Sequence, residues 1–287
     1  MYISISNPEQ PDQIYSLRAD RALFGPKNRA FRYGDAIFES MTYQNERVQL
    51  WGYHCQRLFA ACKTLGFGLP PSYTADWLHG QIANLVALNR LSTARIRLTV
   101  YRADGGWYAP QSEQAFLLIE AYPQNTISWA DTYSTPCIVG ICPTAQKAYH
   151  TLSHLKTSNA LPYIMAARWA REQGHNDALL LNPQGELVEA TAANIWLIRA
   201  GCAHTPPLQS GCIAGVMRQF LLDHLPQIGI AVAQTSLCTA DLYQADELWL
   251  SNAIQGIRRI TQCEQHRYAS PAIDISPVWQ YLAPQYH

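Results

Sequence analysis

This sequence of 287 residues has little lysine. Its four lysines are Lys27, Lys63, Lys147 and Lys156, so most of its positive charge comes from arginine. It also has no net charge, because 21 lysines and arginines balance 21 aspartates and glutamates. A neutral chain with mixed signs offers no electrostatic footprint for nucleic acid or for an anionic membrane surface. We therefore expect a small-molecule substrate held by local charges, and no nucleic-acid partner.

Long apolar runs are missing as well. The longest apolar runs, such as "IVGIC" at 138–142, are far shorter than the roughly 18 apolar residues of a membrane span. We therefore expect no membrane partner. The start of the chain, "MYISISNPEQPDQ", has no basic region followed by an apolar run, and we expect no signal peptide. None of the eight cysteines forms a C-x-x-C pair. Reduced thiols and a cytoplasmic location are the expectation.

Two common nucleotide-binding signatures are absent. The chain has no G-x-G-x-x-G opening a helix and no G-x-x-x-x-G-K-[ST], so a Rossmann or P-loop fold has no support. His150 and His154 stand four residues apart, a spacing that can hold a metal ion. No third ligand accompanies them, and "YHTLSHLKTSN" has no helical apolar stripe, so we expect no metal site.

The pattern of strands and helices predicts an α+β protein with two domains. The length exceeds one typical core, and helical and strand periodicities mix without a regular βαβ alternation. We place a smaller N-terminal α+β domain at 1–121 and a larger C-terminal domain at 136–287. The stretch between them, 122–135, contains Pro, Asn, Ser and Thr with little periodicity and is predicted to be a linker.

Several local elements follow from periodicity and turn chemistry. Residues 31–51 resemble a hairpin that turns at Asn45-Glu46, and Asp35 is interpreted as a turn or helix-cap residue. Glycines at helix ends support these boundaries. The expected helices are 52–66, 74–91, 159–173, 215–225 and 276–284. The expected strands are 94–102, 115–123, 137–142, 177–182, 185–198, 231–237, 246–253 and 257–263.

Six motifs occur in a fixed order between about residues 30 and 260: "YGDAIFES", "HCQRL", "LKTSNALPY", "NPQGELVEATAANIWLI", "TPPLQSGCIAGVMR" and "ADELWLSNA". Together they resemble the class IV family of pyridoxal-phosphate enzymes. That family includes branched-chain aminotransferase, D-amino acid transaminase and 4-amino-4-deoxychorismate lyase. The resemblance implies a fold-type IV structure of the D-amino acid aminotransferase kind, with mixed sheets and helices in each domain. It also implies pyridoxal 5′-phosphate as the cofactor.

By this resemblance, Lys156 is the lysine that carries the cofactor as a Schiff base and moves protons during turnover. Glu189 matches the carboxylate that faces the pyridine nitrogen and keeps it protonated. Arg57 matches the arginine that grips the phosphate with its planar fork. The remaining cofactor contacts are expected from the start of the helix and from two neighbouring strands, at Gly215, Val216, Met217, Asn194, Asn252 and Ala253.

The motifs favour one member of the family over the others. Leu161 stands five residues after Lys156, where branched-chain enzymes typically have tyrosine, and "SNA" follows "ADE" as in aminodeoxychorismate lyase. Ser40 stands where that lyase has a threonine hydroxyl, so we assign it a catalytic role beside Lys156. We therefore predict a lyase that makes 4-aminobenzoate and pyruvate on the folate route. An aminotransferase acting on a D-amino acid or a branched-chain L-amino acid with 2-oxoglutarate remains the alternative.

Two further expectations concern substrate and assembly. The substrate's carboxylates need cations, for which Arg32, Arg97 and Arg102 are the candidates, and Tyr33 is a candidate lining residue. Family members are homodimers in which a loop reaches the neighbour, and "GGWYAP" at 105–110 is compatible with such a loop. We accordingly expect a homodimer.

Overall fold

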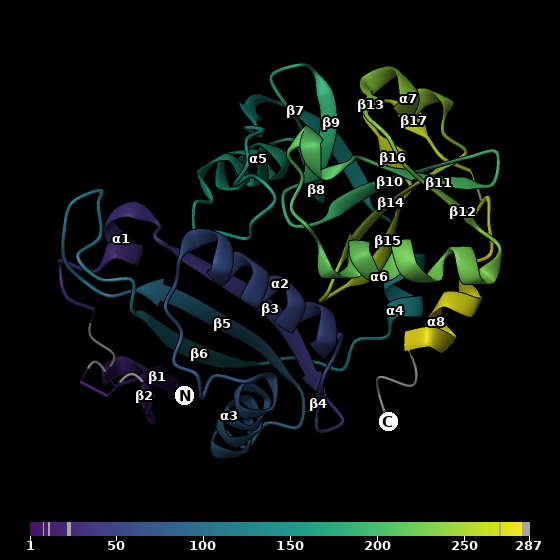
Figure 1. Ribbon diagram of the computed structural model, residues 1–287. Helices are drawn as coiled ribbons and strands as arrows, with labels where there is room; N and C mark the ends of the chain where they lie inside the picture. The colour runs from purple at the N-terminus through teal and green to yellow at the C-terminus, as the bar shows by residue number, and fades with distance from the viewer. Residues whose placement is uncertain (8, 11, 22–23, 270, 283–287) are drawn as a thin grey trace. The chain divides into compact units, whose positions relative to one another are not determined.

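The computed structural model describes residues 1–7, 9–10, 12–21, 24–269 and 271–282. The chain forms two compact units. The first contains Met1–Thr126 together with Lys156–Asn159, and the second contains Ile127–Leu155 and the described part of Ala160–Pro284. Figure 1 colours most of the first unit purple to blue and the second teal to yellow. Both units combine helices with a sheet, so the predicted α+β class is confirmed.

The first unit is built on one six-stranded sheet with the order β2-β1-β6-β5-β3-β4, in which all described pairs are antiparallel. Its elements are β1 (Tyr2–Ser6), β2 (Ile14–Arg18), η1 (Ala19–Arg21), α1 (Arg29–Tyr33), β3 (Ala36–Gln44), β4 (Arg47–Val48), α2 (Trp51–Leu65), α3 (Ala75–Leu88), β5 (Ala94–Arg102) and β6 (Ala115–Pro123).

The sheet of the first unit has one dry face and one more open face. Directly paired residues project to the same side of a sheet, and Met41, Ile96 and Ala121 form such a buried row across β3, β5 and β6. The row next to it, Ser40, Arg97 and Glu120, is only half-buried. Helices α2 and α3 pack against β3, β6 and β1 (Figure 1). The open face therefore carries the polar row, whereas Glu39 is a charged side chain on the covered face.

Both long helices of the first unit agree with the periodicity in the sequence. Helix α2 ends at Gly66, whose φ of 65° is the left-handed conformation that glycine adopts without a steric cost. Helix α3 begins where the Thr74 hydroxyl accepts a hydrogen bond from the Trp77 amide. The hairpin between β3 and β4 is also confirmed, with Gln44 opposite Arg47.

Three expectations for the first unit were incomplete or wrong. The N-terminal strands β1 and β2 were not anticipated. Residues 31–33 belong to helix α1 and not to the hairpin, because the Asn28 side chain caps the Phe31 amide and starts a helix there. Asp35 follows the end of α1, where its amide donates to the Arg29 carbonyl, but the ion pairs of its carboxylate with Arg29 and Arg102 were not anticipated.

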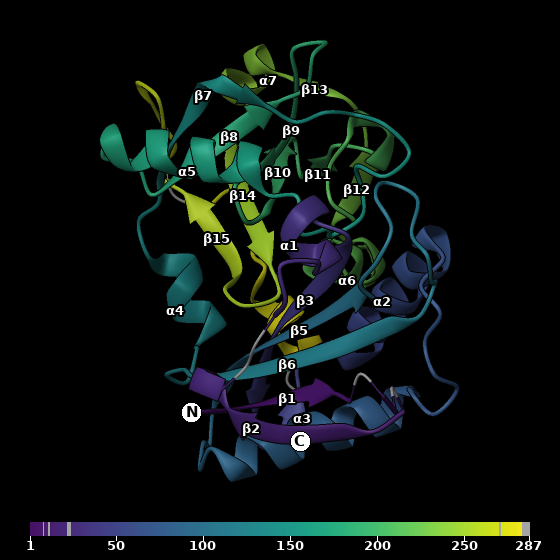
Figure 2. The same cartoon turned by 90° about the vertical axis from the view of Figure 1, so that its left-hand side faces the viewer.

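The second unit is built on an 11-stranded sheet that mixes parallel and antiparallel pairs. Helix α5 packs on β7 and β8 (Figure 2), α6 on β14 and α4 on β15. Its elements are α4 (Trp129–Ser134), β7 (Ile138–Gln146), α5 (Leu161–Glu172), β8 (Asp177–Leu181), β9 (Glu186–Ala190), β10 (Asn194–Arg199), β11 (Cys202–Thr205), η2 (Leu208–Ser210), α6 (Val216–His224), η3 (Pro226–Ile228), β12 (Ala231–Gln234), β13 (Leu237–Cys238), α7 (Thr239–Gln244), β14 (Glu247–Asn252), β15 (Gly256–Ile260), β16 (Gln262–Cys263), β17 (His266–Arg267) and α8 (Ser276–Leu282).

The structure also revises several boundaries in the second unit. The stretch 122–135 contains the end of β6 and helix α4, whose first turn is capped by the Ser128 hydroxyl. The single strand expected at 185–198 is two strands, because residues 191–193 bend between β9 and β10. The closing helix is α8, and the last two residues predicted for it, 283 and 284, lie outside the described residues. Within the described residues, no helix is both long and apolar enough to cross a membrane.

Candidate functional site

The stretch that carries Lys156 joins the sheet of the first unit. The Phe38 amide donates to the Lys156 carbonyl at 3.0 Å, and the Ser158 amide donates to the Ala36 carbonyl at 2.9 Å. Thr157 forms an antiparallel bridge with Ile37. These bonds fix the backbone of Lys156 against strand β3, although the residues on both sides of 156–159 belong to the second unit.

Phe38 is the centre of a group of side chains on the open face of this sheet. The Lys156 Nζ atom lies 4.5 Å from the centroid of the Phe38 ring, and the Arg97 guanidinium carbon lies 3.8 Å from it. Ser40 follows two residues later on the same face of β3 and is paired directly with Arg97. The structure thus brings Lys156 and Arg97, two of the predicted site residues, against one aromatic ring, and places Ser40 on the same face of the sheet.

Arg57 lies on the other side of β3, where helix α2 covers the sheet. Its Nε donates to Glu39 Oε1 at 2.8 Å and its Nη2 donates to Glu39 Oε2 at 2.5 Å. His54 Nδ1 lies 2.6 Å from the same Oε2 atom. Burial opposes the charge of Glu39, but the Arg57 charge and hydrogen bonds from His54 and Arg57 lower its pKa to about 2. Arg57 is therefore held by a carboxylate that stays ionised.

Glu189 lies on β9 of the second unit, with both carboxylate oxygens engaged. The Tyr163 hydroxyl donates to Oε1 at 2.6 Å, and the Ile213 amide donates to Oε2 at 2.9 Å. Lys147 Nζ lies 3.5 Å from Oε1 and donates to the Tyr163 hydroxyl at 2.5 Å. Burial and the charge of Glu189 raise the pKa of Tyr163, so this hydroxyl remains a donor. Tyr163, Ile213 and Lys147 therefore fix the position of the Glu189 carboxylate within the second unit.

The N-terminus of helix α6 has the expected position, with Gly215 at the N-cap. A Cβ atom at Gly215 would lie 1.8 Å from Asn194 Oδ1, so the close approach of Asn194 requires glycine. Asn194 Nδ2 also donates to the Ile213 carbonyl at 2.9 Å and holds the preceding turn. Val216 and Met217 bury their side chains, which leaves only their backbone amides for an anion.

Asn252 and Ala253 lie at the turn from β14 to β15. The Asn252 side chain accepts hydrogen bonds from the Ile254 amide at 3.0 Å and the Gln255 amide at 2.7 Å. Its carboxamide oxygen therefore closes the turn, and Ala253 is part of that turn.

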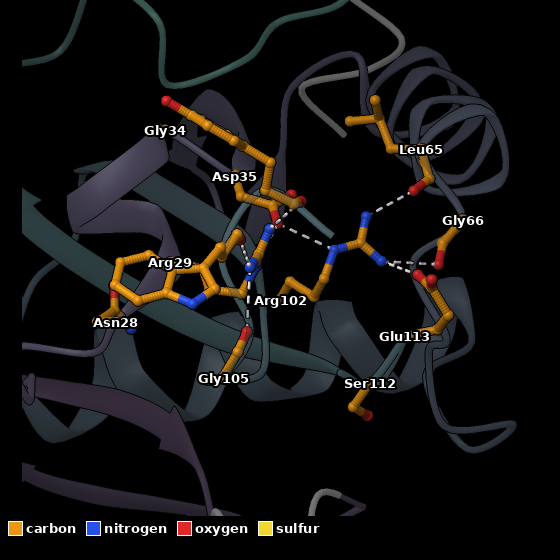
Figure 3. A network of polar contacts seen from close by, with 12 residues as sticks. Asn28, Arg29, Gly34, Asp35, Leu65, Gly66, Arg102, Gly105, Ser112 and Glu113 are labelled. Atoms are coloured by element: carbon orange, nitrogen blue, oxygen red, sulfur yellow. Dashed lines mark hydrogen bonds and ion pairs between the residues drawn. The ribbon is translucent and has the colours of Figure 1, made fainter. Parts of the chain in front are cut away.

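Two of the three arginines considered for substrate lie elsewhere in the first unit. Arg102 is buried and donates to Asp35, Glu113 and the carbonyls of Leu65 and Gly66 (Figure 3). Because the donors of Arg102 already bond to these protein groups, we do not retain Arg102 as a substrate ligand. Arg32 is exposed on α1.

Tyr33, the predicted lining residue, lies at the end of α1. Its ring centroid is 5.6 Å from the Tyr108 ring, and the Arg29 guanidinium carbon lies 5.1 Å from the Tyr33 ring. Tyr33 thus belongs with the loop at 105–110 rather than with any described contact of Lys156.

Sequence reasoning missed the partners of the predicted residues. These are Phe38 beside Lys156, Glu39 and His54 around Arg57, and Lys147 and Tyr163 around Glu189. One signal was available, because Lys147 is among only four lysines in the chain. Phe38, Glu39 and His54 all stand inside the motifs quoted above, but a motif does not say which side chains touch.

A family model described as amino-transferase class IV matches residues 36–263. The chain therefore belongs to the class IV aminotransferase family, whose members depend on pyridoxal 5′-phosphate, and it is an enzyme of that family. The predictions of the family, the cofactor and the enzyme class are confirmed.

Curated relatives include enzymes of more than one activity. The aminodeoxychorismate lyase of Vibrio harveyi is 26% identical over 239 residues, covering 82% of this chain and 85% of the relative. The D-alanine aminotransferase of Listeria innocua is 24% identical over 244 residues, covering 83% and 81%. The branched-chain aminotransferase of Escherichia coli K12 is 24% identical over 232 residues, covering 78% and 74%. These identities are too similar to choose one activity.

Solved structures show the fold. The branched-chain aminotransferase of Escherichia coli aligns with a TM-score of 0.86 at 21% identity, over 99% of this chain and 94% of the other. The 4-amino-4-deoxychorismate lyase of Pseudomonas aeruginosa aligns with a TM-score of 0.79 at 25% identity, over 92% and 94%. The predicted fold-type IV architecture is confirmed.

The described residues fit a phosphorylated pyridine cofactor. Glu189 supplies a buried carboxylate that accepts hydrogen bonds from Tyr163 and Ile213. A carboxylate is the partner that a protonated ring nitrogen requires. The start of α6 supplies backbone amides, and Gly215 has no room for a Cβ atom. Lys156 supplies an amine beside an aromatic ring. The cofactor itself contributes an aldehyde that binds amines and a ring that accepts electrons.

Proposed function

We propose that this enzyme is a 4-amino-4-deoxychorismate lyase, which converts its substrate into 4-aminobenzoate and pyruvate. The observation that carries the proposal is the placement of Ser40, a hydroxyl on the same strand face as the Phe38 ring that Lys156 contacts. A hydroxyl on the same strand face as the ring that the catalytic amine contacts suits a reaction that needs orientation and proton transfer more than a second substrate.

In this proposal each residue has one task. Lys156 removes the proton from the amine-bearing carbon of the substrate and later returns a proton to the departing enolpyruvyl group, which leaves as pyruvate. Ser40 donates a hydrogen bond that orients the substrate. Glu189 would keep the proton on the ring nitrogen of the cofactor. For the phosphate, Arg57 is the candidate ligand of the first unit. The amides of Gly215, Val216 and Met217 are the candidates of the second unit, where Asn194, Asn252 and Ala253 shape the backbone.

Arg97 is the residue we propose for a substrate carboxylate. Its guanidinium lies against Phe38, and its nearest carboxylate is Glu120 at 3.9 Å, which is longer than a hydrogen bond. Arg97 therefore keeps donors for an anion, in contrast to Arg102. A cation in this position also suits an aminotransferase that uses 2-oxoglutarate, and that activity is the second candidate.

The two candidates differ in whether the amine of the substrate stays on the enzyme. We expect the holoenzyme to release pyruvate and 4-aminobenzoate in equal amounts from aminodeoxychorismate, with no co-substrate, and the cofactor spectrum to stay unchanged with L- or D-glutamate. The measurement combines a pyruvate assay with stopped-flow absorbance, and Lys156→Ala is the inactive control. Rapid conversion of the cofactor to its pyridoxamine form by glutamate or D-alanine, without pyruvate release from aminodeoxychorismate, would establish the aminotransferase instead.

We also propose that the enzyme is a homodimer. Large apolar side chains are exposed on each unit, at Phe31, Trp107 and Tyr108 in the first and at Leu161, Ile164 and Met165 along one face of α5 in the second. Exposed patches of this kind mark association surfaces, and in a two-fold dimer the same patch is buried on both subunits. Sedimentation equilibrium is expected to give about twice the chain mass of 32.2 kDa. A fully active monomer would contradict the proposal.

A cytoplasmic location and a place on the folate route stay predictions from the sequence. The second of them depends on the lyase activity, so the pyruvate assay also tests it.

A further inference from the structure

Beneath the sheet of the first unit, three charged or titratable side chains share one buried site. Glu39 comes from β3, and His54 and Arg57 come from α2, 15 and 18 residues further along the chain. Glu39 and His54 are almost completely buried, and the Arg57 side chain is 13% exposed. Nothing in the roles assigned so far uses Glu39 or His54.

Glu39 holds Arg57 by two parallel hydrogen bonds. The carboxylate takes the edge of the guanidinium formed by Nε and Nη2, at 2.8 and 2.5 Å. A bidentate pair fixes the plane of the guanidinium as well as its position. Because the group is planar and rigid, its Nη1 side must then point away from Glu39. The direction in which Arg57 can address an anion is thus decided by Glu39.

His54 completes the arrangement on the other oxygen. Burial lowers the pKa of His54, which favours the neutral ring, so Nδ1 carries the proton that is donated to Glu39 Oε2. Its Nε2 is then an acceptor, and this buried atom has no hydrogen-bond partner among the described residues. His54 therefore supports Arg57 through its hydrogen bond to Glu39.

Stability alone gives little reason for this cluster. A buried ion pair costs desolvation and is often no more stabilising than apolar side chains of the same volume. Glu39 also cancels the charge of Arg57, so Arg57 offers an anion directed N–H groups rather than a net charge. A site with these properties recognises the shape of a phosphate ester.

We propose that Glu39 is the positioning residue of Arg57, supported by His54, and that this pair makes the enzyme selective for the phosphorylated form of its cofactor. The proposal rests on the proposed contact between Arg57 and the cofactor phosphate. A merely structural role for Glu39 would weaken binding of phosphorylated and unphosphorylated cofactor to the same extent, whereas a positioning role affects only the phosphorylated form.

The test compares the dissociation constants of pyridoxal 5′-phosphate and pyridoxal for the full-length apoprotein, followed by tryptophan fluorescence. In Glu39→Gln the constant for pyridoxal 5′-phosphate is expected to rise about tenfold, the effect of losing one well-directed charge-assisted hydrogen bond. The constant for pyridoxal is expected to stay within about twofold. Protection of the apoprotein by inorganic phosphate against thermal unfolding is expected to decrease in parallel.

The selectivity ratio is the dissociation constant of pyridoxal divided by that of pyridoxal 5′-phosphate. Glu120→Gln is the matched control, because Glu120 faces Arg97 of this sheet, and its selectivity ratio is expected to equal that of the wild type. An unchanged or increased ratio in Glu39→Gln would overturn the proposal. If Glu39→Gln does not fold, His54→Leu removes the hydrogen bond to Oε2 and leaves the pair with Arg57. This variant is expected to lower the ratio about threefold, and no decrease would overturn the proposal.

Arg57→Gln separates this inference from the function on which it rests. If Arg57→Gln leaves the ratio unchanged, Arg57 does not contact the phosphate and that part of the proposed function fails. If Arg57→Gln lowers the ratio and Glu39→Gln does not, only the positioning role of Glu39 is overturned.

Discussion

Replacing Asp35 by asparagine is expected to lower the free energy of unfolding by about 3 to 5 kcal/mol, the cost of removing one partner from a buried ion pair. Asp35 Oδ2 accepts hydrogen bonds from Arg29 Nε at 2.8 Å and from Arg102 Nε at 3.0 Å (Figure 3). Both arginine side chains are less than one-tenth exposed. Asparagine has nearly the same shape but no charge, so two guanidinium groups would share a buried site without their common counter-ion.

The rest of the network cannot replace this carboxylate. Glu113 also pairs with Arg102, but its side chain is 63% exposed, and a solvated partner compensates a buried charge poorly. Arg29 donates its remaining hydrogen bonds to the carbonyls of Gly105, Trp107 and Tyr108. Carbonyl dipoles orient the guanidinium without neutralising it, so we expect the loop at 105–108 to loosen together with Arg29.

Urea unfolding of the wild type and Asp35→Asn at one pH measures the loss. Asp20→Asn is the matched control, because Asp20 pairs with Arg18 at an exposed position, where water screens the two charges, and its cost is expected to be much smaller than that of Asp35→Asn. A loss for Asp35→Asn as small as that of the control would show that the two arginines do not depend on Asp35.

Replacing Gly215 by alanine is expected to weaken the binding of pyridoxal 5′-phosphate about 100-fold. The backbone of Gly215 has φ −67° and ψ 137°, which any residue can adopt, so glycine is required here for space alone. An added Cβ atom would lie 1.8 Å from Asn194 Oδ1 and 3.3 Å from the Arg218 Cβ atom. Asn194 would have to move, and its hydrogen bond to the Ile213 carbonyl would be lost or bent.

The expected size follows from how geometry acts in binding sites. A displacement of about 1 Å can cost on the order of 100-fold in a site built from directed groups, and the amides at the start of α6 are such groups. Fluorescence titration of the apoprotein with pyridoxal 5′-phosphate measures the effect. Gly80→Ala is the control, because a Cβ atom at Gly80 meets nothing within 4 Å. Equal affinities for the two variants would place the phosphate away from Gly215.

Local elements were predictable where local physical chemistry decides them. Helices α2 and α3 follow from apolar spacing together with Gly66 and Thr74 at their ends. The start of α6 at Gly215 was equally predictable. Elements decided by contacts with distant residues were missed, as with β1, which pairs with β6. A hydrogen-bond ladder between strands more than 100 residues apart leaves little trace in either strand alone.

The candidate site divides in the same way. Its separate members, such as Lys156, Glu189 and Gly215, were found because each stands inside a motif that resembles a known family. Their neighbours were not, because contact between Tyr163 and Glu189, or between Glu39 and Arg57, depends on how helices pack against strands. Residues 156–158 show the same limit, since they were expected to precede a helix but pair with β3.

The sequence by itself determined the family of this protein, its cofactor and most of its long helices, because motif chemistry and apolar periodicity are properties of neighbouring residues. Only the tertiary structure decided which charges are paired. Arg57, Arg97 and Arg102 are alike in the sequence. In the structure, however, Arg57 pairs with Glu39, Arg97 lies against the Phe38 ring, and Arg102 donates its hydrogen bonds within a buried network. The reason is physical: the donors of a guanidinium are taken by whichever acceptors the fold brings within hydrogen-bond distance, and those acceptors are usually distant in the chain.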